Sequence, residues 1–333
     1  MSSNENMYGV SPKVIDAVRA HVHTVNEYRF ENDALLRDAL VPFFDEALHA
    51  EQIMVGNGGT EVLDIIVRAF VDPSDEIILC SPTFMAYESF ARMAGARVVD
   101  VSLKGESYAL DVEGILKTIN RTTKLLFITN PNNPTGTIAG RESMDRLING
   151  LPEHVVVVYD EVYHHYVEAA DYPRAIDYIR KDKPVIGLHS FSKAYGLAGL
   201  RIAYAFSTPE LSQYIRKIRR PFMINTLSLV AAMAALKDND FLLKSRQMNS
   251  KGRAFLNNLW EYVNIRYTPS ESNFILIKSP ERFSAAQFVQ HLEHEGVMVR
   301  NAGGMGAEGR IRVTVGTPEA NQLLSNVVAS MLC

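Results

Sequence analysis

The chain has 333 residues and a formal net charge of -4, with 47% hydrophobic and 22% charged residues. This ordinary globular composition gives no reason to expect a nucleic-acid partner or an anionic membrane surface. The first residues, MSSNEN, are polar, and no apolar run approaches the roughly eighteen residues of a membrane span, so we expect neither a secretory leader nor a transmembrane segment. A soluble, cytoplasmic protein with two domains, or one large and one small, is the expectation.

Short apolar runs alternate with helix-like segments between about residues 50 and 207. Most of the runs are continuously apolar, as in strands that are covered on both faces. Helical patterns at 60–70 and 85–95 lie between some of them. This alternation predicts an α/β domain around a largely parallel sheet. The seven predicted strands are 53–58, 76–82, 97–103, 124–131, 154–163, 185–192 and 201–207.

The pattern changes after Pro221. A long helical stretch is predicted from about Leu227 to Tyr262, beginning with the alanine-rich SLVAAMAALKD. An amphipathic segment at 284–296 then lies between the first two of three further strand candidates. These elements outline a second, smaller α/β domain. The three strand candidates are 273–279, 297–302 and 310–316.

The cysteines and histidines predict neither a disulfide framework nor a metal site. Cys80 ends the apolar run EIILC and is expected to be a buried thiol, far in sequence from Cys333. His164 and His165 are adjacent, but the other ligands of a spaced metal site are missing. We therefore expect no bound metal.

Polar groups follow several predicted strands, at the edge where the carboxyl ends of strands gather in open α/β sheets. The segments are GGTE after 53–58, PTF after 76–82, PNNPTG after 124–131, DEVY from 160 and SK from 192. Each signal is weak alone, and GNGGTE does not fit the dinucleotide fingerprint. Together they predict one site at one edge of the sheet.

Lys193 and Asp160 carry the sharpest chemical signal. A lysine at the end of an apolar strand is expensive to bury in its charged form, and an uncharged amine is a nucleophile suited to Schiff-base chemistry. Asp160 follows VVVVY, where an enzyme using pyridoxal phosphate (PLP) needs a carboxylate to keep the ring nitrogen protonated. Arg201 can hold a phosphate bidentately, and Gly59 and Thr60 open a helix whose N–H groups offer a second phosphate contact. Taken singly, the lysine could cover apolar surface and the aspartate could cap a helix.

The set of motifs resembles the fold-type I PLP-dependent aminotransferases, and within them the histidinol-phosphate aminotransferase family. The resemblance implies an aspartate aminotransferase-like fold, with a mostly parallel seven-stranded sheet in a large domain and a smaller α/β C-terminal domain. It implies an N-terminal arm at 1–28 that packs with the small domain and a partner subunit, a PLP-binding domain at 29–225 and the small domain at 226–333. The matching segments are SNENMYGVSPKV (3–14), GNGGTE (56–61), PTFMAY (82–87), NPNNPTG (130–136), YDEVY (159–163), SFSKAYGLAGLR (190–201), MVRN (298–301) and RIRVTVGTPEAN (310–321).

The resemblance also implies a role for each cofactor contact. Lys193 would hold PLP covalently and Asp160 would pair with the ring nitrogen. Tyr163 and Asn133 would donate hydrogen bonds to the phenolic oxygen of the cofactor, and Phe84 would stack on its ring, although a core phenylalanine is also compatible with that position. The implied phosphate ligands are Gly59, Thr60, Ser190, Ser192 and Arg201.

Substrate contacts follow from the same resemblance. Arg312 matches the arginine that binds the α-carboxylate, and Arg300 matches the position that contacts the phosphate of histidinol phosphate. Arg310 shares a strand face with Arg312, and from the residues alone either could be a surface charge. Asn6 and Tyr8 would line the pocket.

Tyr28 matches a tyrosine that reaches the cofactor phosphate from the neighbouring subunit, which implies a homodimer with shared active sites. The family usually has a further N-terminal segment ahead of the NEN motif, and proline where this chain has Met7 and Arg29. These differences lie where the substrate would be covered.

The implied reaction is a ping-pong transamination from L-histidinol phosphate to 2-oxoglutarate. Two alternatives use the same cofactor residues: an aromatic amino-acid aminotransferase and a PLP-dependent decarboxylase of a phosphorylated amino acid. A non-catalytic PLP-sensing module fused to a DNA-binding domain is a third alternative, but it would need an added basic segment, and the aminotransferase-like region covers residues 3 to 330.

Overall fold

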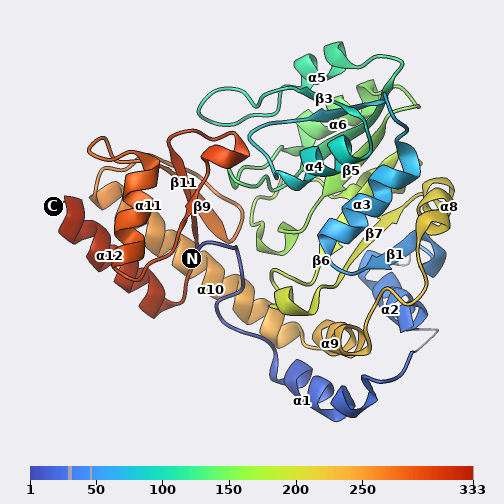
Figure 1. The fold of residues 1–333 in the computed structure, drawn as a ribbon, viewed down its shortest axis with the longest axis horizontal. Helices are drawn as coiled ribbons and strands as arrows, with labels where there is room; N and C mark the ends of the chain where they lie inside the picture. The colour runs from blue at the N-terminus through green and yellow to red at the C-terminus, as the bar shows by residue number, and fades with distance from the viewer. Residues whose placement is uncertain (29–31, 46, 333) are drawn as a thin grey trace.

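The computed structural model describes residues 1–28, 32–45 and 47–332, and its larger sheet has seven strands in the order β1-β7-β6-β5-β4-β2-β3 (Figure 1). Strand β7 runs antiparallel to both of its neighbours, and the other pairs are parallel. This confirms the mostly parallel sheet, in which every strand except β7 ends earlier than predicted. The strands are β1 (Ile53–Gly56), β2 (Glu76–Leu79), β3 (Arg97–Asp100), β4 (Thr123–Thr129), β5 (Val156–Asp160), β6 (Val185–Ser190) and β7 (Ala203–Ser207).

Helices cover both faces of this sheet, which explains why its strands are apolar at successive positions. In β4, Leu125 and Phe127 enter one core, whereas Leu126 and Ile128 enter the other. One core is closed by α3 (Gly59–Phe70), α4 (Ala86–Met93) and α8 (Pro209–Ile218). The other is closed by α2 (Asn32–Leu40), α5 (Val112–Thr118), α6 (Arg141–Gly150), α7 (Ala175–Ile179) and α9 (Thr226–Leu236).

A second, four-stranded sheet has the order β10-β11-β9-β8, and its strand pairs are all antiparallel. Trp260 and Phe288 are fully buried among the residues of its core. In Figure 1 this unit, the small domain, lies to the left of the larger sheet. Its strands are β8 (Tyr267–Thr268), which the sequence pattern does not predict, β9 (Phe274–Lys278), β10 (Arg300–Asn301) and β11 (Arg310–Thr314). Its helices are α10 (Asn239–Tyr262), α11 (Ala285–His294) and α12 (Pro318–Leu332).

The long helical stretch expected from Leu227 to Tyr262 is interrupted between α9 and α10. Asp238 stops it, because this carboxylate caps α10 by accepting a hydrogen bond from the backbone N–H of Phe241 at 3.5 Å. Asp238 also accepts a hydrogen bond from Ser11. The interruption falls where the chain leaves the core of the larger sheet, which contains α9, and enters the smaller unit through α10.

The N-terminal segment lies between the two sheets before α1 (Pro12–His21) packs against α9 (Figure 1). The Met1 carbonyl accepts a hydrogen bond from the backbone N–H of Thr314 at 2.9 Å, so the first residues follow the edge of the small domain. Arg29 lies outside the described residues. Among the residues that the structure describes, no helix combines the length and apolar character needed to cross a membrane.

Candidate active site

A cavity of about 590 Å³ opens at the carboxyl ends of the central strands of the larger sheet. Its walls come from the ends of β4, β5 and β6, the start of α3, the N-terminal segment and the small domain. The structure thus brings together most of the residues that the sequence singles out. The predicted site residues that line it are Gly59, Thr60, Phe84, Asn133, Asp160, Tyr163, Ser190, Ser192, Lys193, Arg201, Arg300 and Arg312.

Asp160 is the last residue of β5, and its carboxylate is buried at the wall of the cavity. It accepts hydrogen bonds from the Tyr87 hydroxyl at 2.6 Å and from the Val162 backbone N–H at 3.1 Å. Burial raises the pKa of Asp160 to about 6 in spite of these two hydrogen bonds. A cationic group that entered the cavity would stabilise the ionised carboxylate.

Arg201 and the start of α3 form an anion-binding corner of the cavity. The Arg201 guanidinium donates to the Thr60 hydroxyl at 3.4 Å, and a Cβ atom at Gly58 would come within 2.5 Å of it. Gly58 also has a φ of +86°, a left-handed conformation that favours glycine, and a side chain there would displace the arginine. No side chain of the described residues caps α3, and the N–H groups of its first turn, at Gly59 and Thr60, are free to bind an anion.

Lys193 and Tyr163 face each other across the cavity. The Lys193 amine lies 5.6 Å from the centre of the Tyr163 ring and donates a hydrogen bond to the Ser3 carbonyl at 3.4 Å. Ser190 and Ser192, on either side of the turn that leads to Lys193, are buried in the same wall. The amine therefore sits within reach of both the sheet edge and the N-terminal segment.

Two arginines of the small domain face the cavity as a cross-strand pair. Arg300 of β10 is directly opposite Arg312 of β11, and like charges in this position repel each other unless an anion lies between them. The Arg312 guanidinium donates to Asn133 Oδ1 at 2.6 Å and to the Ser2 carbonyl at 2.7 Å. Burial lowers the pKa of Arg312, and its Nε has no hydrogen-bond partner among the described residues. This pair has room for an anionic ligand group.

Asn6 and Tyr8 do not line the cavity, contrary to expectation. Asn6 donates hydrogen bonds to the Ala194 carbonyl and to the Ser245 hydroxyl, both at 2.9 Å. The Tyr8 hydroxyl donates to the Gly316 carbonyl at 2.9 Å. Their observed contacts fasten the N-terminal segment, and its earlier residues, from 3 to 5, reach the cavity instead.

Tyr28 and Arg310 also lie away from the cavity within the chain. The Tyr28 side chain is 85% exposed, and its ring centre lies 4.9 Å from that of Phe222. Arg310 pairs with Glu106 at 3.5 Å and lies over the ring of Tyr108, so of the two arginines on its strand only Arg312 faces the site.

Comparison with known proteins agrees with this geometry. Residues 1–327 match the family model described as aminotransferase class I and II. The chain is 37% identical over its whole length to a histidinol-phosphate aminotransferase of Moorella thermoacetica, covering 85% of that protein, and 36% identical to histidinol-phosphate aminotransferase 1 of Nitrosococcus oceani, covering 88%. The chain belongs to the aminotransferase class I and II family.

Solved structures of other aminotransferases share the fold. The crystal structure of histidinol-phosphate aminotransferase from Sinorhizobium meliloti in complex with pyridoxal-5'-phosphate superposes with a TM-score of 0.90 at 27% identity, over 99% of this chain and 90% of that one. A Thermus thermophilus aspartate aminotransferase variant superposes with a TM-score of 0.85 at 22% identity, over 98% and 95% of the two chains. The aspartate aminotransferase-like fold is therefore confirmed.

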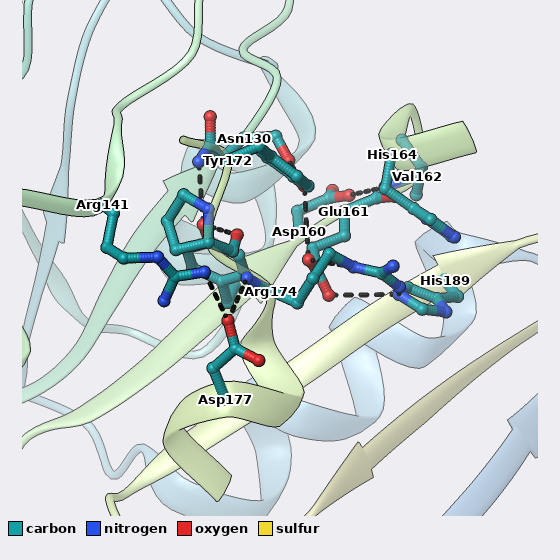
Figure 2. A network of polar contacts seen from close by, with 12 residues as sticks. Asn130, Arg141, Asp160, Glu161, Val162, His164, Tyr172, Arg174, Asp177 and His189 are labelled. Atoms are coloured by element: carbon teal, nitrogen blue, oxygen red, sulfur yellow. Dashed lines mark hydrogen bonds and ion pairs between the residues drawn. The ribbon is translucent and has the colours of Figure 1, made fainter. Parts of the chain in front are cut away.

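Next to the cavity, this aminotransferase has a buried polar network centred on Glu161 (Figure 2). Glu161 accepts from Arg174 at 3.1 Å and from Tyr172 at 3.2 Å, and lies 3.1 Å from His189 Nε2. His164 stacks on His189 with ring centres 3.9 Å apart. Burial lowers the pKa of both imidazoles, so they are neutral at pH 7.

The paired histidines of the sequence thus belong to a packed network. No group of three residues able to hold a metal ion occurs in the described parts of the chain.

Sequence reasoning missed two residues of the site, Tyr87 and Asn4. Tyr87 ends the segment PTFMAY and is buried in α4, where its hydroxyl reaches Asp160. Asn4 lies in the NEN motif, and its amide donates to the Tyr163 hydroxyl at 3.0 Å. The motifs containing them were recognised, but only the folded chain shows which side chain of each motif points at the site.

Proposed function

We propose that the protein is a PLP-dependent aminotransferase that converts L-histidinol phosphate and 2-oxoglutarate into imidazole-acetol phosphate and L-glutamate, a step of histidine biosynthesis. One observation carries the proposal: Arg300 and Arg312 form a pair of cations in the same cavity as Lys193 and Asp160. The full-length similarity to histidinol-phosphate aminotransferases of 34–37% identity supports the same conclusion.

The donor set of the cavity fits PLP. The corner formed by Gly59, Thr60 and Arg201 offers N–H groups and a guanidinium to a phosphate, and Gly58 leaves space for the guanidinium beside them. Burial raises the pKa of Asp160 in spite of its hydrogen bonds and the nearby Lys193, and the protonated ring nitrogen of PLP would supply a positive charge beside the carboxylate. Ser190 and Ser192 would complete the phosphate contacts, and Phe84, Asn133 and Tyr163 are available to the ring.

When bound, PLP supplies the electron sink that makes the α-proton of an amino substrate acidic. The Lys193 amine would hold the cofactor and, once the substrate has displaced it, would act as the general base that takes the proton from the substrate's α-carbon. Asp160 would keep the ring nitrogen protonated, and Tyr163 and Asn133 would donate hydrogen bonds to the phenolic oxygen. The same groups act in reverse order when a 2-oxo acid takes up the amino group.

The two arginines account for the substrate in both directions. The amino donor carries a phosphate, whereas glutamate carries two carboxylates, so the site has to accept different anions in alternate half-reactions. Arg312 is buried and hydrogen-bonded, which suits the α-carboxylate position that stays the same in glutamate. Arg300 is exposed on β10, which suits an anion that differs between substrates, the phosphate of the amino donor or the second carboxylate of glutamate. Guanidinium groups bind phosphate and carboxylate bidentately.

We also propose a homodimer with shared active sites. Tyr28 is too exposed to serve its own chain, and in a dimer its hydroxyl would reach the cofactor phosphate of the partner. Apolar side chains of the same part of the chain, including Val25, Leu35 and Phe43, are also at least half exposed, which suits an interface. The buried free thiol of Cys80 suits a reducing cytoplasm.

The test is a single-turnover absorbance experiment on protein loaded with PLP. One sample receives L-histidinol phosphate, and parallel samples receive L-phenylalanine or L-tyrosine. We expect histidinol phosphate to convert the bound cofactor rapidly to pyridoxamine phosphate and the aromatic amino acids to do so slowly. Arg300→Gln should weaken the response to histidinol phosphate far more than the response to the aromatic substrates, because only the former has a phosphate.

The other outcomes identify other reactions. Fast conversion by the aromatic amino acids alone would make the protein an aromatic aminotransferase and remove the phosphate role of Arg300. Cofactor absorbance that neither donor changes would point to a decarboxylase or another amine. If the unaltered protein showed no more cofactor absorbance than Lys193→Ala, which means none, the whole proposal would be contradicted.

A further inference from the structure

Asn4 is a buried polar residue in the N-terminal segment, beside the cavity. Its side chain is only 1% exposed, and its neighbours Ser3 and Glu5 line the cavity with it. Its φ is +56°, in the left-handed region that asparagine tolerates better than other residues with a side chain. A residue held in this backbone conformation, at this depth, has its side-chain direction fixed.

The hydrogen bonds of Asn4 form a connected network, and each bond in it has a defined donor and acceptor. The backbone N–H of Asn4 donates to Thr314 Oγ1 at 3.0 Å, and the Thr314 hydroxyl donates to Asn4 Oδ1, also at 3.0 Å. Since Oδ1 accepts from Thr314, the amide group Nδ2 faces Tyr163 and donates to its hydroxyl oxygen at 3.0 Å. Asn273 Nδ2 donates to the Asn4 carbonyl at 3.1 Å and holds the backbone in place.

This hydrogen-bond network determines the direction in which the Tyr163 hydroxyl donates its proton. The Tyr163 oxygen accepts from Asn4, so its only proton is left to be donated elsewhere. Tyr163 is 3% exposed and lines the cavity, so the donation is directed into it. An acceptor at the position of Asn4 would reverse this arrangement by taking the tyrosine proton for itself.

We propose that Asn4 is a positioning residue, which orients the Tyr163 hydroxyl so that its proton points at the phenolic oxygen of bound PLP. The inference rests on the proposed function. Asn4 acts only through Tyr163, and its own amide need not touch cofactor or substrate. Through Thr314 and Asn273, the small domain determines the orientation of a hydroxyl that belongs to the large domain.

The test is a pH titration of the absorbance of PLP bound to Lys193, compared across four variants. The hydrogen bond from Tyr163 stabilises the negative phenolic oxygen, so losing it should move the titration midpoint to higher pH. We expect Tyr163→Phe to raise the midpoint, and Asn4→Ala to raise it by up to about one pH unit. Asn4→Asp, which has the same shape but accepts a hydrogen bond, should raise it further than Asn4→Ala does. The double variant Asn4→Ala with Tyr163→Phe should match Tyr163→Phe alone.

Three results would overturn the inference. Asn4 variants that titrate like the unaltered protein would show that the amide does not orient Tyr163. Equal shifts for Asn4→Asp and Asn4→Ala would exclude a role for donor direction, and additive shifts in the double variant would exclude action through Tyr163. If Asn4→Ala fails to fold, Asn4→Gly replaces it, because glycine accepts the positive φ. An unaltered protein without cofactor absorbance would contradict the proposed function first, so the two failures are distinguishable.

Discussion

Asp160 and Glu161 are adjacent in the chain and both buried, yet their surroundings differ. Asp160 lines the cavity and accepts hydrogen bonds from one hydroxyl and one backbone N–H. Glu161 lies within the network of Figure 2, in contact with Arg174, Tyr172 and His189. Burial raises the pKa of Asp160 to about 6. Burial also raises the pKa of Glu161, but the Arg174 guanidinium and the hydrogen bond with His189 outweigh it and hold the pKa below its ordinary value.

The difference separates a functional carboxylate from a structural one. Glu161 finds all its partners within the protein, so its charge is stabilised when the chain folds. Asp160 is folded into place without an equivalent cation, and the missing charge has to come from a ligand. Such a group lowers the stability of the empty protein while preparing the site for its cofactor.

The largest effect is expected from Asp160→Asn. Turnover should fall roughly a thousandfold, because the neutral amide cannot hold the ring nitrogen of PLP in its protonated form. The cofactor-free protein should instead become up to about 3 kcal/mol more stable at pH 7, the free energy equivalent of the raised pKa. Steady-state kinetics and chemical denaturation measure the two effects. A variant that lost stability without cofactor would contradict the interpretation of Asp160.

Glu161→Gln should show the reverse behaviour. Removing one partner of this buried ion pair leaves Arg174 and His189 without their carboxylate, and we expect the free energy of unfolding to fall by about 3 kcal/mol. Turnover per folded molecule should change far less than in Asp160→Asn. Arg141→Ala is the control, because it breaks an ion pair with Asp177, whose carboxylate is 27% exposed whereas that of Glu161 is fully buried, and it should cost less than about 1 kcal/mol. If Glu161→Gln and Arg141→Ala lowered the free energy of unfolding by similar amounts, Glu161 would not differ from an ordinary surface ion pair.

The affinity for PLP should depend on pH through Asp160. Its pKa in the folded protein is raised, so the carboxylate is ionised above about pH 6 and protonated below it. Only the ionised form can pair with the ring cation, so we expect affinity to fall about tenfold for each pH unit below this value. The phosphate of PLP titrates in the same range. Equilibrium dialysis of Asp160→Asn isolates the carboxylate, since this variant should keep only the pH dependence that belongs to the phosphate and to the bond with Lys193.

Tyr87→Phe gives the smallest expected effect. It removes the hydroxyl that donates to Asp160 at 2.6 Å and leaves the ring stacked on Phe127. Without this hydrogen bond the pKa of Asp160 should rise further, and the pH midpoint of PLP binding should move up by as much as about one unit. Equilibrium dialysis of PLP at a series of pH values measures this change in the midpoint. An unchanged midpoint would show that burial alone determines the ionisation of Asp160.

The sequence predicts the elements of the larger sheet because their signals are local. Apolar runs, most of them continuous, identify all seven strands, and the polar residues after several of them identify one site at one sheet edge. The sequence pattern does not predict the interruption before α10, because the alanine-rich segment before Asp238 and the helical pattern after it together resemble one continuous helix. Strand β8 has only two residues, too few for a periodic pattern.

The site contacts that the sequence does not predict join distant parts of the chain. Asn4 reaches Tyr163 and Thr314, and Glu161 meets a histidine from β6. The contacts of Asn4 depend on how the N-terminal segment passes between the two sheets, and that of Glu161 depends on the pairing of β5 with β6, neither of which a local pattern encodes. The sequence identifies the N-terminal segment as part of the pocket, but which of its residues face the cavity depends on contacts such as those of Asn6 and Tyr8 with Ala194 and Gly316.

The position of Met1 has a practical consequence for fusion proteins and labels. Its carbonyl is hydrogen-bonded to Thr314, two residues after Arg312, and burial lowers the pKa of its amino group. A tag or fluorophore attached at this end begins beside the cavity and would crowd Arg300 and Arg312. The end of α12, by contrast, lies at the outer side of the small domain (Figure 1). Affinity tags for purification and surface immobilisation therefore belong at the C-terminal end, whereas an environment-sensitive dye at the N-terminal end would report on ligands entering the site.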